Sequence, residues 1–134
     1  MLKIGELKEG DLVMVEYDGQ WREGEVTNVD RLDGKVCVPS VEDEEFWYDA
    51  KHLKPILLDE SYIFKLGFQK QANDDGSIKY TKGAFRVLAH EPGNFSNFEM
   101  WYREDRRHIS HPINVHEFQN DFLDMTKVPL TKGE

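Results

Sequence analysis

Aromatic and acidic side chains lie close together between residues 16 and 48, and they are the residues best suited to recognise a ligand. Aromatic rings bind cations and form grooves for proline-rich peptides, and neighbouring carboxylates favour a positively charged partner. We therefore predict a partner-binding surface made of Tyr17, Trp21, Glu23, Glu44, Glu45, Trp47 and Tyr48, with Glu16 and Phe46 beside them. The alternative is that many of these rings form the core, because aromatic side chains gain much free energy from burial.

The other reactive side chains show no pattern typical of catalysis. His108, His111 and His116 lack the compact spacing of zinc ligands, and no serine lies in a Gly-x-Ser-x-Gly sequence. No glycine-rich loop that could hold a phosphate precedes a helix. We therefore expect no catalytic residue, no metal, no cofactor and no enzymatic activity; the remaining alternative is a small hydrolase with a deep polar pocket. We interpret His116 and Asn120 as structural residues that form hydrogen bonds to the sheet or the preceding loop.

The only basic cluster is short and interrupted by acids. Arg103, Arg106 and Arg107 share it with Glu104 and Asp105. It could contact phosphate, which is the weakest of our functional alternatives, but a solvent-exposed hairpin tip is the favoured interpretation.

The net charge of −9 and the isoelectric point near 5.0 argue against a nucleic-acid partner. Binding to the phosphate backbone requires a surface rich in Lys and Arg. Most of the negative charge lies in residues 1–58, where seven Lys and Arg stand against fourteen Asp and Glu, a net charge of −7. This distribution favours a protein partner with a basic surface.

The N-terminal pattern predicts a small β-barrel of the SH3-like kind in residues 1–58. Apolar residues alternate along short segments, and Asp18-Gly19 and Asp33-Gly34 are strong turn signals. Gly24 inside the second segment indicates a bulge or a sharp bend. The expected strands are Leu12–Tyr17, Trp21–Val29, Lys35–Ser40, Phe46–Tyr48 and Lys54–Leu58, with one 3₁₀ turn at Lys51–Leu53.

Residues 59–134 read as a small α+β unit that shares a core with the barrel, so we expect Gly10–Leu58 alone to be unstable. Asp59 is a good N-cap for a short helix, Glu60–Leu66. A second helix begins after Asn114 and carries an apolar stripe of Val115, Phe118, Phe122 and Met125. We expect strands at Phe68–Ala72, Ile78–Lys82, Ala84–His90 and Phe95–Glu104, a charged turn at Asp105–His108, and a frayed tail at Lys127–Glu134.

The chain contains one cysteine, Cys37, in a predicted strand. A single cysteine permits no internal disulfide, and we expect it to be a small buried residue. No signal peptide and no apolar stretch of membrane-spanning length are evident, so we expect a cytoplasmic protein without membrane contact.

Three short motifs resemble those of small uncharacterised proteins of Bacteroidetes genomes, prophages and mobile elements. The run Pro55–Leu58 followed by Tyr62–Phe68 resembles their PIPLTEEILLKLGF junction, Gly93-Asn94 matches a dipeptide that follows it, and Val115–Asn120 resembles a C-terminal VHQLQN helix. Asn114 and Glu117 depart from that pattern. The resemblance covers most of the chain and implies a bacterial or phage source, but no activity.

These features together predict a non-enzymatic protein-binding or accessory module of a mobile element or phage. The alternative is that the acidic surface mimics nucleic acid and inhibits a host defence protein or a DNA-handling protein.

Overall fold

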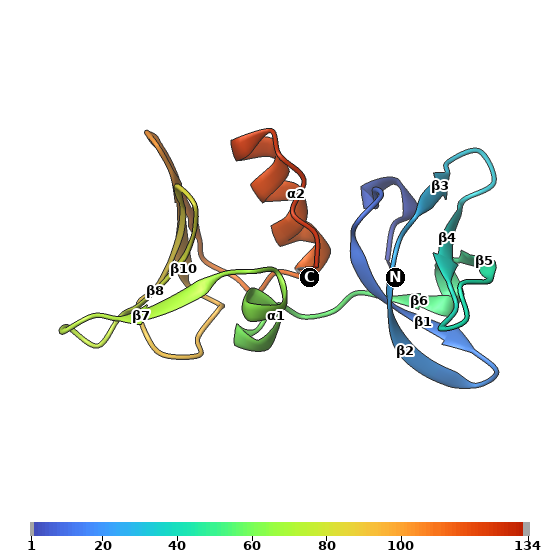
Figure 1. The fold of residues 1–134 in the computed structure, drawn as a ribbon, viewed down its shortest axis with the longest axis horizontal. Coiled ribbons are helices and arrows are strands. Elements are labelled where there is room, and N and C mark those ends of the chain that lie inside the picture. The colour runs from blue at the N-terminus through green and yellow to red at the C-terminus, as the bar shows by residue number, and fades with distance from the viewer. Residues whose placement is uncertain (1, 133–134) are drawn as a thin grey trace.

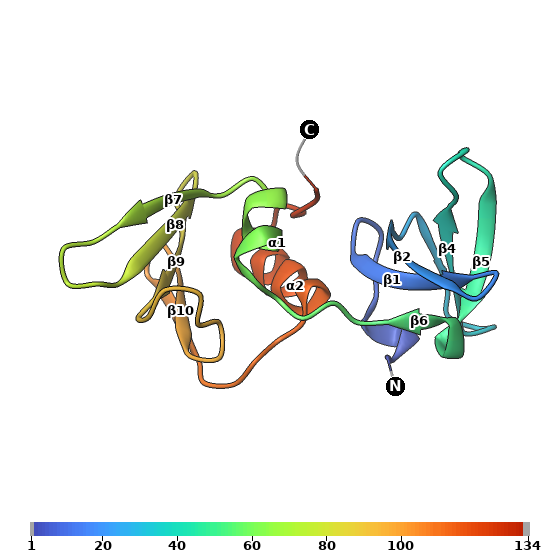
Figure 2. The ribbon, with the colours of Figure 1, turned by 90° about the horizontal axis from the view of Figure 1, so that it is seen from below.

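Residues 2–132, which the computed structural model describes, are arranged in three layers (Figure 1). A five-stranded antiparallel sheet forms one side and two three-stranded sheets form the other. Two helices, α1 (Glu60–Lys65) and α2 (Val115–Thr126), lie between them, as the view from below also shows (Figure 2). Neither helix in the described range has the length and apolar character that a bilayer crossing requires.

The N-terminal sheets contain strands in the predicted segments, with two differences. The expected strand Trp21–Val29 is divided into two strands that belong to different sheets, and the expected strand Lys54–Leu58 is a strand only at Lys54. One sheet has the order β2-β1-β6, with β1 at Leu12–Tyr17, β2 at Gln20–Glu25 and β6 at Leu53–Lys54. The other has the order β3-β4-β5, with β3 at Asn28–Asp30, β4 at Lys35–Pro39 and β5 at Glu45–Asp49. Two 3₁₀ turns accompany them, η1 at Ile4–Glu6 and η2 at Ala50–His52. Among residues 2–132 the two sheets remain separate hydrogen-bonded units and form no closed barrel.

Local sequence explains how the chain turns between these strands. Asp18 and Gly19 join β1 to β2 with φ angles of 54° and 76°, which a two-residue type I′ hairpin requires at both positions. Beyond β2 the backbone changes partners: Val26 N donates to Asp11 O at 2.9 Å, and Thr27 N donates to Cys37 O at 2.9 Å. The segment 20–30 therefore passes from one sheet into the other.

The interpretation of Gly24 as a bulge is wrong. The pairing of β1 with β2 is continuous from Tyr17↔Gln20 to Leu12↔Glu25, and Gly24 pairs with Val13 inside it. A Cβ atom at Gly24 would collide with the Val38 side chain of β4. The glycine is therefore required for the close approach of the two sheets.

The space between the N-terminal sheets is filled by aliphatic residues and one tyrosine. Its buried members are Leu2, Leu7, Val13, Val15, Val26, Val36, Val38, Tyr48 and Leu53. Cys37 is 1% exposed, as predicted, although it lies on the other face of β4 from Val36 and Val38.

The C-terminal sheet is an antiparallel meander with the order β11-β10-β9-β8-β7. The prediction of a charged turn at Asp105–His108 is wrong. This segment belongs to an edge strand, and the chain reverses two residues earlier, at Arg103-Glu104. The edge strand is mostly exposed and charged, so its sequence lacks the apolar alternation that indicates a strand. The strands are β7 (Gln69–Ala72), β8 (Ile78–Lys82), β9 (Phe85–Ala89), β10 (Phe98–Tyr102) and β11 (Asp105–Ile109).

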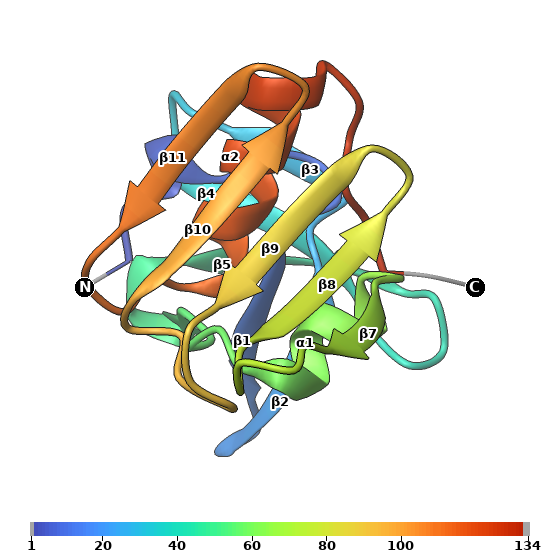
Figure 3. The same ribbon diagram turned by 90° about the vertical axis from the view of Figure 1, so that its left-hand side faces the viewer.

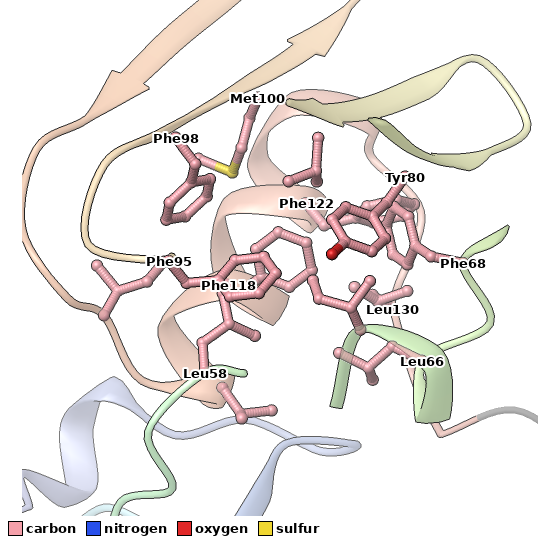
Figure 4. Packing of buried hydrophobic residues seen from close by; sticks show 14 of the residues in the cluster. Leu58, Leu66, Phe68, Tyr80, Phe95, Phe98, Met100, Phe118, Phe122 and Leu130 are labelled. Atoms are coloured by element: carbon pink, nitrogen blue, oxygen red, sulfur yellow. The ribbon is translucent and has the colours of Figure 1, made fainter. Parts of the chain in front are cut away.

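The larger core lies between this sheet and the helices. The predicted stripe of α2 is buried, and its Phe118 and Phe122 pack against Phe68 (Figure 4). Both rings also pack against Phe85, with 4.6 Å between the ring centroids of Phe85 and Phe122. Asp59 caps α1 by accepting a hydrogen bond from Tyr62 N at 3.1 Å, and Glu117 of α2 accepts one from Asn114 N at 2.9 Å.

The C-terminal tail is not frayed over its described length. Leu130 is 1% exposed and belongs to the larger core, whereas Gly133 and Glu134 lie outside the described residues. The tail therefore covers one end of the core.

The side chain of Gln119 connects α2 to the N-terminal strands. Its Oε1 accepts from Leu12 N at 2.8 Å, and its Nε2 donates to Gly10 O at 2.8 Å and to Leu130 O at 2.9 Å. Asn120 Nδ2 donates to Glu6 O at 2.9 Å, and His116 Nε2 lies 3.4 Å from Glu6 Oε2. His116 and Asn120 thus both contact Glu6 of η1, and the prediction that they form hydrogen bonds to the sheet or the preceding loop is wrong.

Candidate partner-binding surface

Two adjacent hollows lie on the surface of the N-terminal part and share the rings of Tyr17, Phe46 and Tyr48. The first has a volume of about 320 Å³ and extends to the loop of residues 40–44. The second has a volume of about 510 Å³ and extends to the Asp18-Gly19 turn and to Trp47. The Tyr17 and Phe46 rings pack together with 5.0 Å between their centroids, so they form a ridge shared by both hollows.

The rings differ in how much surface they offer. Tyr17 is 56% exposed and Trp47 is 45% exposed, so a ligand could bury substantial aromatic area. Tyr48 is buried and helps to line both hollows, and within the described chain its hydroxyl group has no hydrogen-bond partner. An unpaired buried hydroxyl costs about 1–3 kcal/mol, and because the Tyr48 oxygen itself is buried, this cost is borne by the core between the sheets.

Carboxylates surround the hollows. Glu42 and Glu44 line the first hollow and Asp18 lines the second, and these three acids form no ion pair with other residues in the range 2–132. Arg22 also lines the first hollow, and because its Nη2 donates to the neutral Pro39 O at 2.9 Å, its charge offsets only one of the two carboxylates there. In the second hollow, His52 Nδ1 lies 3.2 Å from Glu16 Oε1, and Asp18 has no partner of opposite charge among residues 2–132. The uncompensated charge at this surface is therefore negative.

The structure separates Trp21 and Glu23 from this surface. Trp21 pairs with Glu16, and because side chains alternate along β1 and β2, Trp21 and Glu23 point away from the face that carries Tyr17. The Trp21 ring lies under Lys54, with 4.0 Å between its centroid and Nζ. The alternation of the strands was the sequence signal that could have separated these residues from Tyr17.

Glu23 is instead a contact between β2 and the C-terminal part. It accepts from Tyr62 Oη at 2.7 Å, from Lys132 Nζ at 2.8 Å and from Lys65 Nζ at 3.3 Å. Burial acts to raise the pKa of Glu23, but the hydrogen bonds from these three donors outweigh it and hold the pKa below its usual value. Glu45 is exposed on β5 opposite Pro39 and lines neither hollow.

The other sequence candidates do not converge. His108 contacts Asn97, His111 contacts Pro112 and His116 contacts Glu6, and no group of at least three His, Cys, Asp or Glu side chains suited to a metal ion occurs in the described range. The arginine cluster is also dispersed. Arg103 lies over Tyr102, and Arg107 binds Asp105 and Asp124, the latter at 2.8 Å. Arg106 points to the opposite face of the sheet from Arg107.

Comparisons of the chain with family models, with curated proteins and with solved structures found no significant match. The interpretation of the aromatic surface therefore rests on its own side chains.

Proposed function

We propose that the chain is a non-enzymatic protein-binding module whose N-terminal part is a small SH3-like β-barrel. Its working surface is the aromatic ridge of Tyr17 and Phe46 with Trp47, Tyr48 and the surrounding carboxylates. The observation that carries this proposal is the pair of hollows that share these rings and have unpaired acids at their rims. The barrel interpretation is supported by the segment 20–30, which passes between the sheets, and by β6, which returns to pair with β1.

The partner that fits this surface is an extended, positively charged segment of another protein. Apolar or proline side chains on either side of the ridge would enter the hollows, while a Lys or Arg side chain would approach Asp18, Glu42 or Glu44. Exposed ion pairs contribute only about 0–1 kcal/mol each, so the buried aromatic area supplies most of the affinity. The carboxylates mainly speed association and select against acidic partners.

An accessory role in the cytoplasm of a bacterial or phage-infected cell completes the proposal. It is supported by the resemblance of the segments 55–68 and 115–120 to small proteins of mobile elements.

A library of immobilised 12-residue peptides, both basic and acidic and with or without proline, tests this function. We expect the full chain to select basic peptides. For a selected peptide, Tyr17→Ala should weaken binding at least tenfold, because it removes half of the ridge. Glu44→Gln should weaken binding several-fold and reduce its salt dependence, whereas Glu45→Gln, outside both hollows, should have little effect.

Two results would contradict the proposal. One is that Tyr17→Ala binds the selected peptide as tightly as the wild type does. The other is capture only of nucleic-acid-binding proteins that DNA displaces, which would instead support mimicry of nucleic acid by the acidic surface.

A further inference from the structure

The outer face of the five-stranded sheet is uncovered. Figure 3 shows this sheet in front, with both helices behind it. Side chains alternate along its strands, so Val87 of β9 is buried against the helices while Arg86 and Leu88 face outward and are half-buried. The outward positions carry several cations, namely Lys79, Arg86, Arg106 and, when protonated, His108.

This face is positively charged although the chain is acidic. Glu99 is the single carboxylate at its outward strand positions, and Arg106 Nε donates to Glu99 Oε1 at 2.7 Å while His90 Nε2 lies 2.9 Å from Glu99 Oε2. Burial acts to raise the pKa of Glu99, but Arg106 outweighs it and lowers the pKa, so the carboxylate stays ionised and occupied. Lys79 and Arg86 form no ion pair within residues 2–132, so their charges are available to a ligand.

Three flat groups form a row across the centre of the face. Trp101 on β10 pairs with Arg86 on β9 and with Arg106 on β11. The Cζ atoms of Arg86 and Arg106 lie 5.1 Å and 4.4 Å from the centroid of the Trp101 ring. Neighbouring strands are about 4.8 Å apart, so the row extends for about 10 Å. The Trp101 ring therefore lies between the two guanidinium groups, and the row offers the outer planes of the guanidinium groups together with their hydrogen-bond donors.

We propose that this face binds single-stranded nucleic acid. Phosphates would approach Lys79 and Arg86, and unpaired bases would stack on the guanidinium planes of Arg86 and Arg106, which the Trp101 ring between them holds in place. A single strand fits better than a duplex, because duplex bases are already stacked and a flat sheet does not enter a groove. It also fits better than an acidic peptide, whose carboxylates would meet the cations but would not use the planar groups.

The net charge of −9 does not prevent this interaction. The acidic N-terminal part lies on the far side of the helix layer (Figure 1). A helix with its side chains is about 10 Å wide, and the Debye length at physiological salt is about 8 Å. The repulsion between the N-terminal acids and a strand on the outer face is therefore largely screened.

Fluorescence anisotropy of the full chain with a labelled 12-nucleotide oligothymidine tests the proposal. We expect binding at 50 mM salt that weakens about tenfold at 200 mM, as two or three phosphate contacts to a single strand imply. The double variant Lys79→Ser/Arg86→Ser should bind at least tenfold more weakly and lose most of the salt dependence. The matched control Lys51→Ser, an exposed lysine of η2, should bind as the wild type does.

The stacking contribution is tested separately with Trp101→Leu, with thermal unfolding monitored to confirm that each variant is folded. This variant should weaken binding several-fold while keeping the salt dependence. The proposal is wrong if the wild type does not bind the oligonucleotide at 50 mM salt, or if a duplex of the same length binds equally well. Tighter binding of an acidic peptide such as deca-glutamate would also overturn it, in favour of an acidic protein partner.

Discussion

Gln119 shows how one side chain can join segments that are distant in sequence. Its amide contacts Gly10, Leu12 and Leu130, and the side chain is completely buried. The residue stands within the helical motif Val115–Asn120, but helical periodicity could not show that its amide faces a strand more than 100 residues earlier. Only the packing of α2 against β1 brings these groups together.

Replacing Gln119 with Met should lower the free energy of unfolding by about 2–4 kcal/mol. The variant keeps the volume of the side chain but leaves a buried N–H and two buried carbonyl groups without partners. Urea denaturation measures the change. The control Gln71→Met, on the exposed strand β7, should change stability by less than about 0.5 kcal/mol. An equally small effect at Gln119 would show that water or a rearranged tail replaces its hydrogen bonds.

Glu23 makes stability depend on pH in the acidic range. Its pKa is lowered in the folded state from the ordinary value of 4.5, so the unfolded chain binds the proton more readily. The stabilisation is therefore fully present above pH 4.5 and is lost as the pH falls through the lower folded pKa. Glu23→Gln should reduce stability by about 1 kcal/mol at pH 7 and by progressively less below the ordinary pKa.

Denaturation at pH 7, 5, 4 and 3 measures this difference. Glu25→Gln on the same strand is the control, because Glu25 is exposed and forms no hydrogen bond or ion pair through its side chain with any residue between 2 and 132. If the difference in free energy of unfolding between wild type and Glu23→Gln does not vary with pH, the ionised Glu23 carboxylate is not the source of this stabilisation.

At the scale of elements, local signals predicted the strands and helices whose apolar residues are periodic. The Asp18-Gly19 hairpin, the one-turn helix η2 and the buried stripe of α2 follow from turn chemistry and periodicity alone. The edge strand β11 did not follow, because its residues are charged and mostly exposed and lack the apolar alternation that indicates a strand. The same strand places Arg106 on the outer face, so the row of Arg86, Trp101 and Arg106 could not be predicted from the sequence either.

The contact between β2 and β4 gives a prediction at this scale. Gly24→Ala should lower stability by about 1–3 kcal/mol, because its Cβ collides with Val38. Adding Val38→Ala removes the obstructing methyl groups, so the double variant should be more stable than the sum of the single effects predicts, with a coupling of about 1 kcal/mol. Gly5→Ala is the control, since a Cβ added at Gly5 would have no other atom within 4 Å. Strict additivity would contradict the proposed collision.

At the scale of the whole molecule, the larger core contains residues from both sides of the predicted boundary near residue 58. Leu12, Ile56 and Leu58 are buried in the same cluster as the helices and the five-stranded sheet. The division into residues 1–58 and 59–134 was read from the patterns on each side. The arrangement of the two N-terminal sheets could not be predicted in the same way. It depends on which distant strands pair with each other, and the apolar pattern of a single strand does not specify its partner.

A fragment of residues 1–58 should not unfold cooperatively. It keeps Leu2 and Leu7 but exposes Leu12, Ile56 and Leu58 to water, and it loses the hydrogen bonds of Gln119. Thermal unfolding followed by circular dichroism, with the full chain as reference, tests this expectation. A sharp transition together with a well-dispersed amide spectrum would show that the N-terminal part folds independently.

The buried Cys37 gives this chain an internal reporter of partial opening. A water-soluble thiol reagent reaches it only after the groups that cover this face of β4 have moved, so the labelling rate measures how often this part of the β3-β4-β5 sheet is uncovered in the native protein. Because the chain has one cysteine, the signal comes from one place and needs no engineered probe. Labelling that responds to Gly24→Ala but not to a change in the far sheet would mean that the two ends of the molecule open separately.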